Sequence, residues 1–421
     1  MKPFIFFLFT FFFPALMAQQ DLSLESVVDS AIAYHPRSQD MELLRKINQN
    51  KIDNNTVNWY PEISLNGQAS YQSDVVEINI DDSPFNGLDF PTAPKDQYKA
   101  YIDINQTLYD AGRTRKQKEI ENLSLQSSLL ETEKDIEKVK SSVIEIFYRI
   151  LILQENLKIL KLSLDQIDEN IDRVQAAIDN GIALSSDIEL LKVERLDIQQ
   201  QIENLDRQKE SAASMLSSLC GMSISPTDNF NITHLTMDSL EINRKELKLL
   251  RQNKQVLGKS YELTESARLP VAFAFGQFGY GNPGLNLLND AFDTYYIVGV
   301  GFRWEIWDWS RTNRTKTNIE YQRGLIENKE KEFIESIERA KMNQQSIIEN
   351  HQENIQNYQQ ILALREKITQ TYENKLSEGT ITSLDLLNVT NQERIMRIKL
   401  NNEKILLQKS IAEFKLLTGN F

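Results

Sequence analysis

The 421-residue sequence has very little of what an enzyme or a disulfide-stabilised domain needs. Its single cysteine, Cys220, excludes an internal disulfide framework, and we expect it to pack as a small buried residue. The three histidines, His35, His234 and His351, lie in different segments without the spacing of metal ligands. The sequence therefore predicts no catalytic site, no cofactor and no metal, and the chain is not expected to be an enzyme.

Long apolar runs and an excess of basic charge are also missing. Lys and Arg number 47 against 60 Asp and Glu, so the net charge is −13 and a nucleic-acid partner is not expected. Residues 1–18 combine Lys2, an apolar stretch and a small-residue end, which is typical of a secretory signal peptide. No later stretch approaches the ~20 apolar residues of a transmembrane helix. An exported chain of this kind is either soluble or crosses a membrane as a β-barrel.

Proline and glycine are absent from several long stretches, and this absence predicts helices. None occurs between Gly112 and Gly181, or within 380–418. These stretches are rich in Glu, Lys, Gln, Leu and Ile, which favour helix. A helix of this length would span roughly 100 Å at about 1.5 Å per residue, so such helices must pack lengthwise on one another, as in a coiled coil. The expected long helices are about 111–179, 184–220, 309–377 and 382–418.

The two halves of the sequence repeat each other. At an offset of 198 residues, Asp187 aligns with Asp385 and Gly181 with Gly379, without a gap over more than a hundred residues. We therefore expect a first structural repeat at 19–225, which begins with short helices, and a second at 226–421, which begins with a helix at about 240–267. Each repeat would contain one β-hairpin, one long helix, a glycine turn and a further helix.

The hairpins, at about 61–109 and 270–307, are predicted from alternation of apolar and polar residues. Ile63 and Leu65 alternate with polar residues in the first, and Val298, Val300 and Phe302 alternate with glycine or charge in the second. Four strands of ~10 residues with aromatic ends are typical of a transmembrane barrel. Four strands cannot close alone, because the smallest closed barrels have eight, so the chain would have to assemble. A soluble two-sided sandwich is the alternative.

One motif points to a different chemistry. Residues 279–284 read Gly-Tyr-Gly-Asn-Pro-Gly and match the dinucleotide fingerprint G-x-G-x-x-G after a strand. The fingerprint requires a helix to begin there, and Pro283 with the polar stretch after it does not begin one. We expect the tip of an outer loop instead.

The order of these features resembles the TolC family of outer-membrane efflux channels. The matching motifs are Tyr60-Pro61, the run 108–112 (Leu-Tyr-Asp-Ala-Gly), Gly181 six residues before Asp187, Gly379-Thr380 followed by Asp385, and Leu417-Thr418-Gly419. The resemblance covers nearly the whole chain after the signal peptide. It implies a mixed α and β fold, mostly α, in which a homotrimer closes a 12-stranded β-barrel in the outer membrane. An α-barrel of long helices would continue it as a tunnel through the periplasm.

The resemblance also implies a function and partners. The chain would be the passive exit duct of a tripartite efflux or type I secretion system, exporting small molecules or proteins across the outer membrane. Its partners would be other copies of itself, outer-membrane lipid, a periplasmic adaptor (membrane fusion protein) and an inner-membrane transporter of the RND, ABC or MFS type. The alternative from another class is a soluble exported coiled-coil scaffold or periplasmic adaptor, which would have no use for amphipathic strands.

The two acids after the glycine turns have a structural and a functional interpretation. Asp187 and Asp385 each fall in the first turn of a helix, and Thr382-x-x-Asp385 matches a capping box, which by itself accounts for them. The resemblance adds that Asp187 and Asp385 lie at the periplasmic entrance, where Asp385 matches an acid of the family. There, three-fold symmetry would make a ring of carboxylates that holds cations and repels anions.

Other entrance positions depart from the family's type member. Asn388 stands where that member has a second acid, while Leu376 and Ile381 replace a tyrosine and an arginine that lock its closed entrance. A polar lock is therefore not expected, and closure would rest on apolar packing of Leu376, Ile381 and Leu384. The turns at Gly181, Gly379 and Thr380 would be where the adaptor docks. Glycine is suited to such a turn because it adopts positive φ without steric cost.

Overall fold

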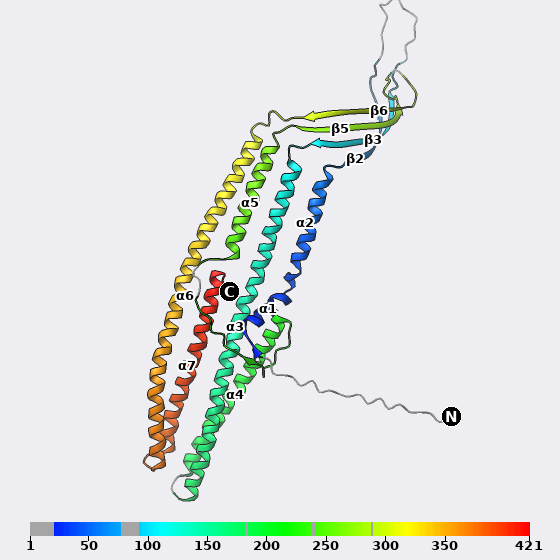
Figure 1. Ribbon diagram of the computed structural model, residues 1–421. Helices are drawn as coiled ribbons and strands as arrows, with labels where there is room; N and C mark the ends of the chain where they lie inside the picture. Colours follow the sequence, from blue (N-terminus) through cyan, green and yellow to red (C-terminus); the bar gives the residue numbers. More distant parts are fainter. Residues whose placement is uncertain (1–20, 77–91, 182–183, 238–240, 288) are drawn as a thin grey trace, which may run out of the picture. The chain divides into compact units, whose positions relative to one another are not determined.

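The computed structural model describes residues 21–76, 92–181, 184–237, 241–287 and 289–421. It is mostly helical with one four-stranded sheet, which confirms the expected mixed, mostly α fold (Figure 1). The predicted signal peptide lies outside the described residues, and so do residues 77–91 of the first predicted hairpin. Within the described residues, no helix combines the length and the apolarity that crossing a membrane requires.

Four long helices dominate the fold, and they come in two equal pairs. Their bounds are α3 (Arg113–Asp179), α4 (Ser185–Cys220), α6 (Arg311–Ser377) and α7 (Ser383–Thr418). α3 and α6 both have 67 residues, and α4 and α7 both have 36. Their starting points differ by the same 198 residues as the sequence repeat. The absence of proline explains how such lengths form, because proline in a helix interior removes a hydrogen bond and clashes with the preceding turn.

The remaining elements are short. They are β1 (Asp21–Leu22), α1 (Leu24–Tyr34), the 3₁₀ turn η1 (Pro36–Ser38), α2 (Asp40–Val57), β4 (Asn229–Phe230) and α5 (Lys245–Ser266). β1 and β4 pair in parallel although more than two hundred residues separate them. This pairing ties the start of the first half to the start of the second.

The chain forms two compact units. One contains Met1–Ser38, Thr132–Lys245 and Ile334–Phe421, and the other contains Gln39–Glu131 and Glu246–Phe333. Each unit takes corresponding segments from both halves of the chain, and α3 and α6 each contribute to both units. The first unit holds both glycine turns, and the second holds the four-stranded sheet.

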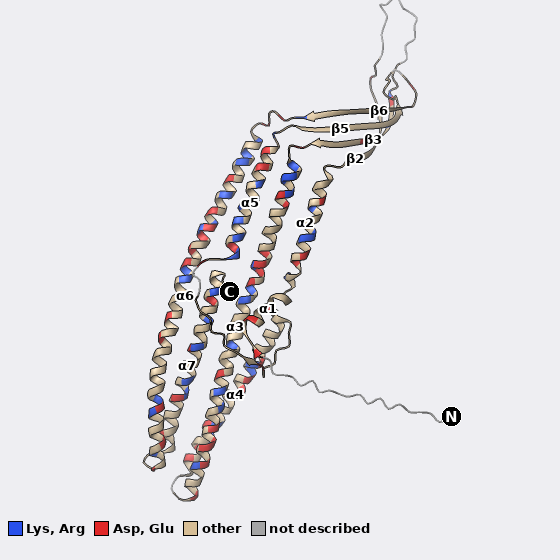
Figure 2. Ribbon diagram, viewed as in Figure 1, with Lys and Arg blue, Asp and Glu red and all other residues tan. Residues whose placement is uncertain are grey.

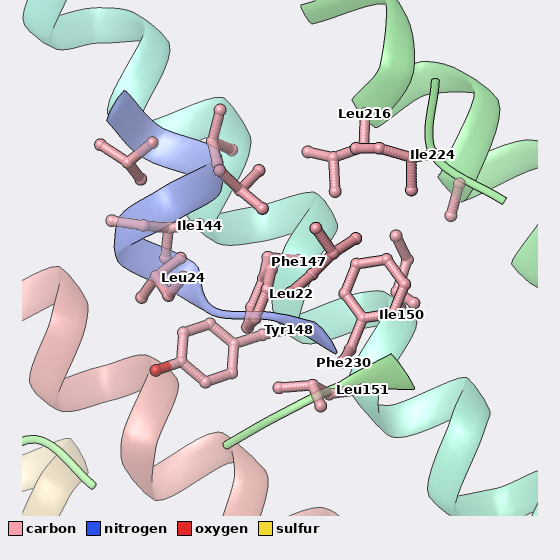
Figure 3. Packing of buried hydrophobic residues seen from close by; sticks show 14 of the residues in the cluster. Leu22, Leu24, Ile144, Phe147, Tyr148, Ile150, Leu151, Leu216, Ile224 and Phe230 are labelled. Atoms are coloured by element: carbon pink, nitrogen blue, oxygen red, sulfur yellow. The ribbon is translucent and has the colours of Figure 1, made fainter. Parts of the chain in front are cut away.

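The largest core cluster of the first unit lies where α1, α3 and α4 meet the β1–β4 pair (Figure 3). The rings of Phe147 and Phe230 meet edge to face with centroids 5.5 Å apart. Leu22, Leu24 and Leu216 fill the space around them. Cys220 belongs to the same cluster as a buried free thiol, which confirms its predicted role. This cluster packs the C-terminal halves of both α4 and α7, because it contains Leu216 and Cys220 of α4 and Ile405 and Ala412 of α7.

The sheet of the second unit has the order β2-β3-β5-β6, with every neighbouring pair antiparallel. Its strands are β2 (Glu62–Tyr71), β3 (Asp96–Tyr109), β5 (Val271–Asn282) and β6 (Asp293–Arg303). The two hairpins are joined by the β3–β5 pairing, which is regular except for a shift between Thr107 and Tyr109. The four predicted strands are therefore present, in one sheet, and β2 and β6 form its edges.

One face of this sheet is apolar and exposed. A row of side chains crosses all four strands, with Leu65 opposite Ile102, Ile102 opposite Phe278, and Phe278 opposite Tyr296. Leu65, Val300 and Phe302 are 79%, 78% and 77% exposed. Figure 2 shows that charged residues are frequent along the helices and sparse on the strands. An exposed apolar surface of this extent requires a nonpolar environment.

The other face is polar on β2 and β3, whereas β5 carries Phe273 and Phe275 there, opposite Gly301 and Gly299 of β6. Ser64 lies opposite Asp103, which in turn lies opposite Gln277. On β5, the Phe275 ring covers Gly299, where an added Cβ would come within 2.6 Å of the ring. Glycine at this position lets an aromatic ring lie flat across the neighbouring strand.

The same packing corrects the interpretation of the 279–284 motif. Gly279 to Asn282 belong to β5 rather than to a loop tip, and only Pro283 and Gly284 lie beyond the strand. An added Cβ at Gly279 would lie 2.4 Å from the ring of Tyr295. These glycines make room for cross-strand neighbours, and a helix does not follow them. The last strand also ends earlier than its alternation suggested, at Arg303.

Candidate functional site at the helical turns

The α6–α7 turn is a glycine-terminated helix end of the Schellman type. Gly379 has a φ of +72°, and its N–H donates to the carbonyl of Leu376 at 2.9 Å. The Thr380 N–H donates to the carbonyl of Lys375 at 3.0 Å, and the Thr380 hydroxyl donates to the same carbonyl at 3.0 Å. An added Cβ at Gly379 would meet open space, so glycine is needed here for its backbone conformation. Thr380 is exposed at the tip.

The α3–α4 turn begins in the same way. Gly181 has a φ of +75°, and its N–H donates to the carbonyl of Ile178 at 2.8 Å. Its surroundings are also open, so an added Cβ would meet nothing within 4 Å. The two residues that follow lie outside the described residues, and the chain is described again from Leu184, whose side chain is 70% exposed.

Asp385 closes a capping box at the start of α7. Its backbone N–H donates to the Thr382 hydroxyl oxygen at 3.3 Å, while its carboxylate accepts from the Thr382 N–H at 3.0 Å and from the Thr382 hydroxyl at 2.7 Å. The hydrogen bonds from the Thr382 side chain and backbone hold the pKa of Asp385 below its usual value. Asp385 is exposed, so its ionised carboxylate can also act on ions in solution.

Asp187 occupies the corresponding position of α4 but is less firmly held. Its carboxylate accepts from the Leu184 N–H at 3.4 Å. Leucine stands where the second turn has Thr382, so there is no hydroxyl to complete a reciprocal pair. The two acids predicted from the sequence thus share a helix position, and their hydrogen bonding differs.

The apolar residues predicted for the entrance have different exposures. Leu376 and Ile381 are half-buried, while Leu384 is 45% exposed and Asn388 is also exposed. Within this chain, the contacts that secure the turn are formed one turn deeper, by Leu387. It packs against the α3–α4 clusters that contain Ile167, Val174 and Ile188.

Sequence reasoning missed a buried ion pair between the two hairpins α3–α4 and α6–α7. Arg394 of α7 and Glu194 of α4 lie 2.8 Å apart, with side chains 13% and 16% exposed. Removing one partner of such a pair destabilises the fold, because the remaining charge is left buried without an opposite charge beside it. No sequence signal marks these two charges, since each stands among other charges on a long helix.

A polar groove lies beside this pair, between α3 and the α6–α7 hairpin. It has a volume of about 400 Å³. Its charged lining includes Glu169, Arg173, Glu366, Glu373, Arg394 and Arg397. Both signs of charge occur there, and the described residues contain no group of His, Cys, Asp and Glu that could hold a metal ion. The groove is suited to a polar protein partner more than to a small apolar ligand.

Four antiparallel strands continued by two long helical hairpins are the fold of bacterial outer-membrane channels. The outer membrane protein VceC from Vibrio cholerae shares it at 14% identity, with a TM-score of 0.61 over 94% of this chain and 96% of that one. The open state of the MtrE outer membrane channel from Neisseria gonorrhoeae gives 13% identity and a TM-score of 0.66 over 94% and 89%. CusC, whose structures are described with transmembrane channel formation, is 13% identical, with a TM-score of 0.68 over 96% of this chain and 93% of that one.

The sequence itself supports a more specific assignment. Residues 27–222 match the family described as outer membrane efflux protein. No curated protein matches the sequence significantly. The family match over residues 27–222 and the shared fold both agree with the resemblance to the TolC-type outer-membrane efflux channels.

Proposed function

We propose that three copies of this chain form an outer-membrane channel that serves as the exit duct of an efflux or secretion system. The observation that carries this proposal is the sheet with one exposed apolar face and an opposite face that is polar on β2 and β3. Lipid is the environment that such an apolar face requires, and a water-filled lumen suits the polar side. A soluble scaffold or adaptor would leave Leu65, Val300 and Phe302 in water.

Assembly of the barrel would use the two edges of the sheet. β2 and β6 are each paired on one side only within the described chain. Unpaired strand edges inside a bilayer are unfavourable, because their N–H and C=O groups have no water to bind. Pairing β6 of one copy with β2 of the next would satisfy both edges, and three copies would close twelve strands.

The glycine turns would form the periplasmic entrance of this channel. Three copies of Asp385 would make a ring of carboxylates, and the low pKa of each would keep the ring charged at neutral pH. Such a ring favours cations at the mouth of a pore. Asn388 adds no second ring, and Leu376, Ile381 and Leu384 would supply an apolar contact between copies in place of a polar lock.

The turns would also be the docking site of a periplasmic adaptor. Gly181, Gly379 and Thr380 are exposed, and no side chain crowds either glycine, so a loop of another protein can approach the backbone closely. The mixed charges of the groove beside α3 could pair with a polar helical partner. Energy would come from an inner-membrane transporter of the RND, ABC or MFS type. The duct itself would perform no enzymatic step.

Reconstitution of the purified protein into planar bilayers tests this function. We expect stable conductance with a preference for cations, and a reduced preference in Asp385→Asn. Asp385→Glu is the matched control, because it keeps the negative charge at the same position. Absence of conductance in the wild type would overturn the channel. Conductance with equal cation preference in Asp385→Asn would leave the channel standing and reduce Asp385 to a helix cap.

A further inference from the structure

Each edge strand of the sheet carries a charge at the end nearest its helix. Glu62 begins β2 and Arg303 ends β6, and both side chains are exposed. Neither forms an ion pair with any residue that the structure describes, although the Arg303 guanidinium lies over the Phe273 ring at 5.9 Å. Both charges belong to the face opposite the apolar one, since they alternate with Ile63 and Phe302. The two edges therefore present opposite charges on the same face.

Gly67 in the middle of β2 is a second feature that one copy of the chain does not explain. The other glycines of the described strands each have a neighbouring atom within 4 Å of an added Cβ. Val298, for example, lies directly opposite Gly276 and covers it. Gly67 has nothing within 4 Å, has no positive φ that would require glycine, and lines a hollow of about 450 Å³. A glycine inside a strand often marks the close approach of another backbone or ligand.

The apolar face limits how β6 of one copy can pair with β2 of the next. Directly opposite residues of an antiparallel pair point to the same face. The apolar side chains stand at odd positions in β2, such as Leu65, and at even positions in β6, such as Val300 and Phe302. A slip of one residue would turn every side chain to the other face. The registers that keep the apolar face continuous therefore differ in steps of two residues.

One of these registers pairs the whole of β2. With Leu65 opposite Val300, every residue of β2 lies opposite a residue of β6. In this register Glu62 faces Arg303. A slip of two residues one way leaves Arg303 beyond the start of β2, and a slip of two the other way sets it opposite Ser64. Of the three registers, only the first brings the two opposite charges together.

The stagger of the strands gives an independent check on this choice. The row of paired residues that starts at Leu65 reaches Tyr296 within one copy, and in this register Tyr296 lies opposite Ala69 of the next copy. The row thus advances by four residues over four strands. At about 3.3 Å per residue and about 4.8 Å between strands, this stagger tilts the strands by roughly 35°. Closed barrels have tilts of about 35–45°, whereas the register with a stagger of two would give only roughly 20°.

We propose that neighbouring copies join in this register, with Arg303 of one copy paired to Glu62 of the next and Val298 of one copy covering Gly67 of the next. The inference rests on the proposed trimeric channel and names the residues by which its copies recognise each other. Val298 would cover Gly67 on the next copy as it covers Gly276 within its own. The same copy would bring the 71% exposed Tyr296 to the edge of the hollow beside Gly67.

Disulfide cross-linking of the full chain tests the register. In a Cys220→Ser background, Leu65→Cys is combined in turn with Val298→Cys, Val300→Cys or Phe302→Cys, which replace exposed side chains of one face. After oxidation, we expect covalent oligomers on a denaturing gel mainly from the pair with Val300→Cys. Directly opposite Cβ atoms lie about 5 Å apart, whereas diagonal neighbours lie about 7–8 Å apart. Stronger cross-linking in either shifted pair, equal cross-linking in all three or none in any would overturn the register.

Charge reversal tests the ion pair separately. Glu62→Arg and Arg303→Glu should each lower the temperature at which the oligomer dissociates by about 3 °C or more, and the double variant should regain most of this loss. Asp103→Arg combined with Arg303→Glu is the control and should regain nothing, because Asp103 lies on the interior strand β3. Single variants as stable as the wild type, or a double variant no better than the control, would refute the pair. A wild type that conducts but fails these tests keeps the channel and loses the register, whereas a wild type without conductance loses the channel itself.

Discussion

The ion pair between Glu194 and Arg394 joins the α3–α4 hairpin to α7, and its removal should loosen the turns. Both side chains are mostly buried at 2.8 Å, so Arg394→Gln leaves the Glu194 carboxylate without its partner. A fully buried pair costs about 3–5 kcal/mol when one member is removed; some water reaches these side chains, so we expect about 2–3 kcal/mol. This corresponds to a roughly 30- to 150-fold change in a local opening equilibrium, at about 1.4 kcal/mol per factor of ten.

Hydrogen–deuterium exchange of the reconstituted protein measures this opening helix by helix. We expect protection to fall in α4 and α7 around the pair in Arg394→Gln and in Glu194→Gln, and to be restored in large part in the double variant, which strands no charge. Lys192→Gln is the control, because its pair with Glu189 joins residues of one helix and leaves both side chains more than half exposed. Equal protection in all variants, or simple additivity in the double variant, would refute the coupling between the hairpins.

Three further predictions concern the glycines and Asp385. Gly379→Ala should destabilise the protein by about 1–2 kcal/mol, because an L-residue is strained at positive φ, whereas Gly324→Ala within α6 should stabilise it by about 0.5–1 kcal/mol; unfolding in denaturant distinguishes the two signs. Gly299→Ala should destabilise the sheet by about 1–3 kcal/mol, because the added methyl group would clash with the Phe275 ring. Adding Phe275→Ala to this variant should remove the clash. A double variant that is no more stable than Gly299→Ala alone would contradict this explanation. The ionised Asp385 cap stabilises the folded state fully at pH values above the unfolded carboxyl pKa of about 3.9, and this stabilisation is lost as the pH falls through the lower pKa of the folded state. The difference in unfolding midpoint between the wild type and Asp385→Asn should therefore shrink below about pH 4.

Local chemistry made part of this fold predictable from sequence. Gly379 stops a helix because its positive φ is accessible mainly to glycine, and the Thr382–Asp385 spacing places an acceptor on the first turn of the next helix. Alternation predicted the strands for a similarly local reason, since every second side chain faces the same side of a sheet. The motif at 279–284 was misinterpreted because the sequence alone does not distinguish a glycine that makes room for a cross-strand ring from one that binds a phosphate.

The residues that could not be predicted are those whose environment depends on packing between helices. Glu194 and Arg394 lie two hundred positions apart, and Lys209 stands in a helix where basic residues usually face water. On a helix of 36 residues, a small rotation about the helix axis determines which charged side chains are buried. The amino-acid composition does not determine that rotation. The Glu194–Arg394 pair is therefore where this structure adds most to the sequence, because only packing distinguishes these two charges from their solvated neighbours.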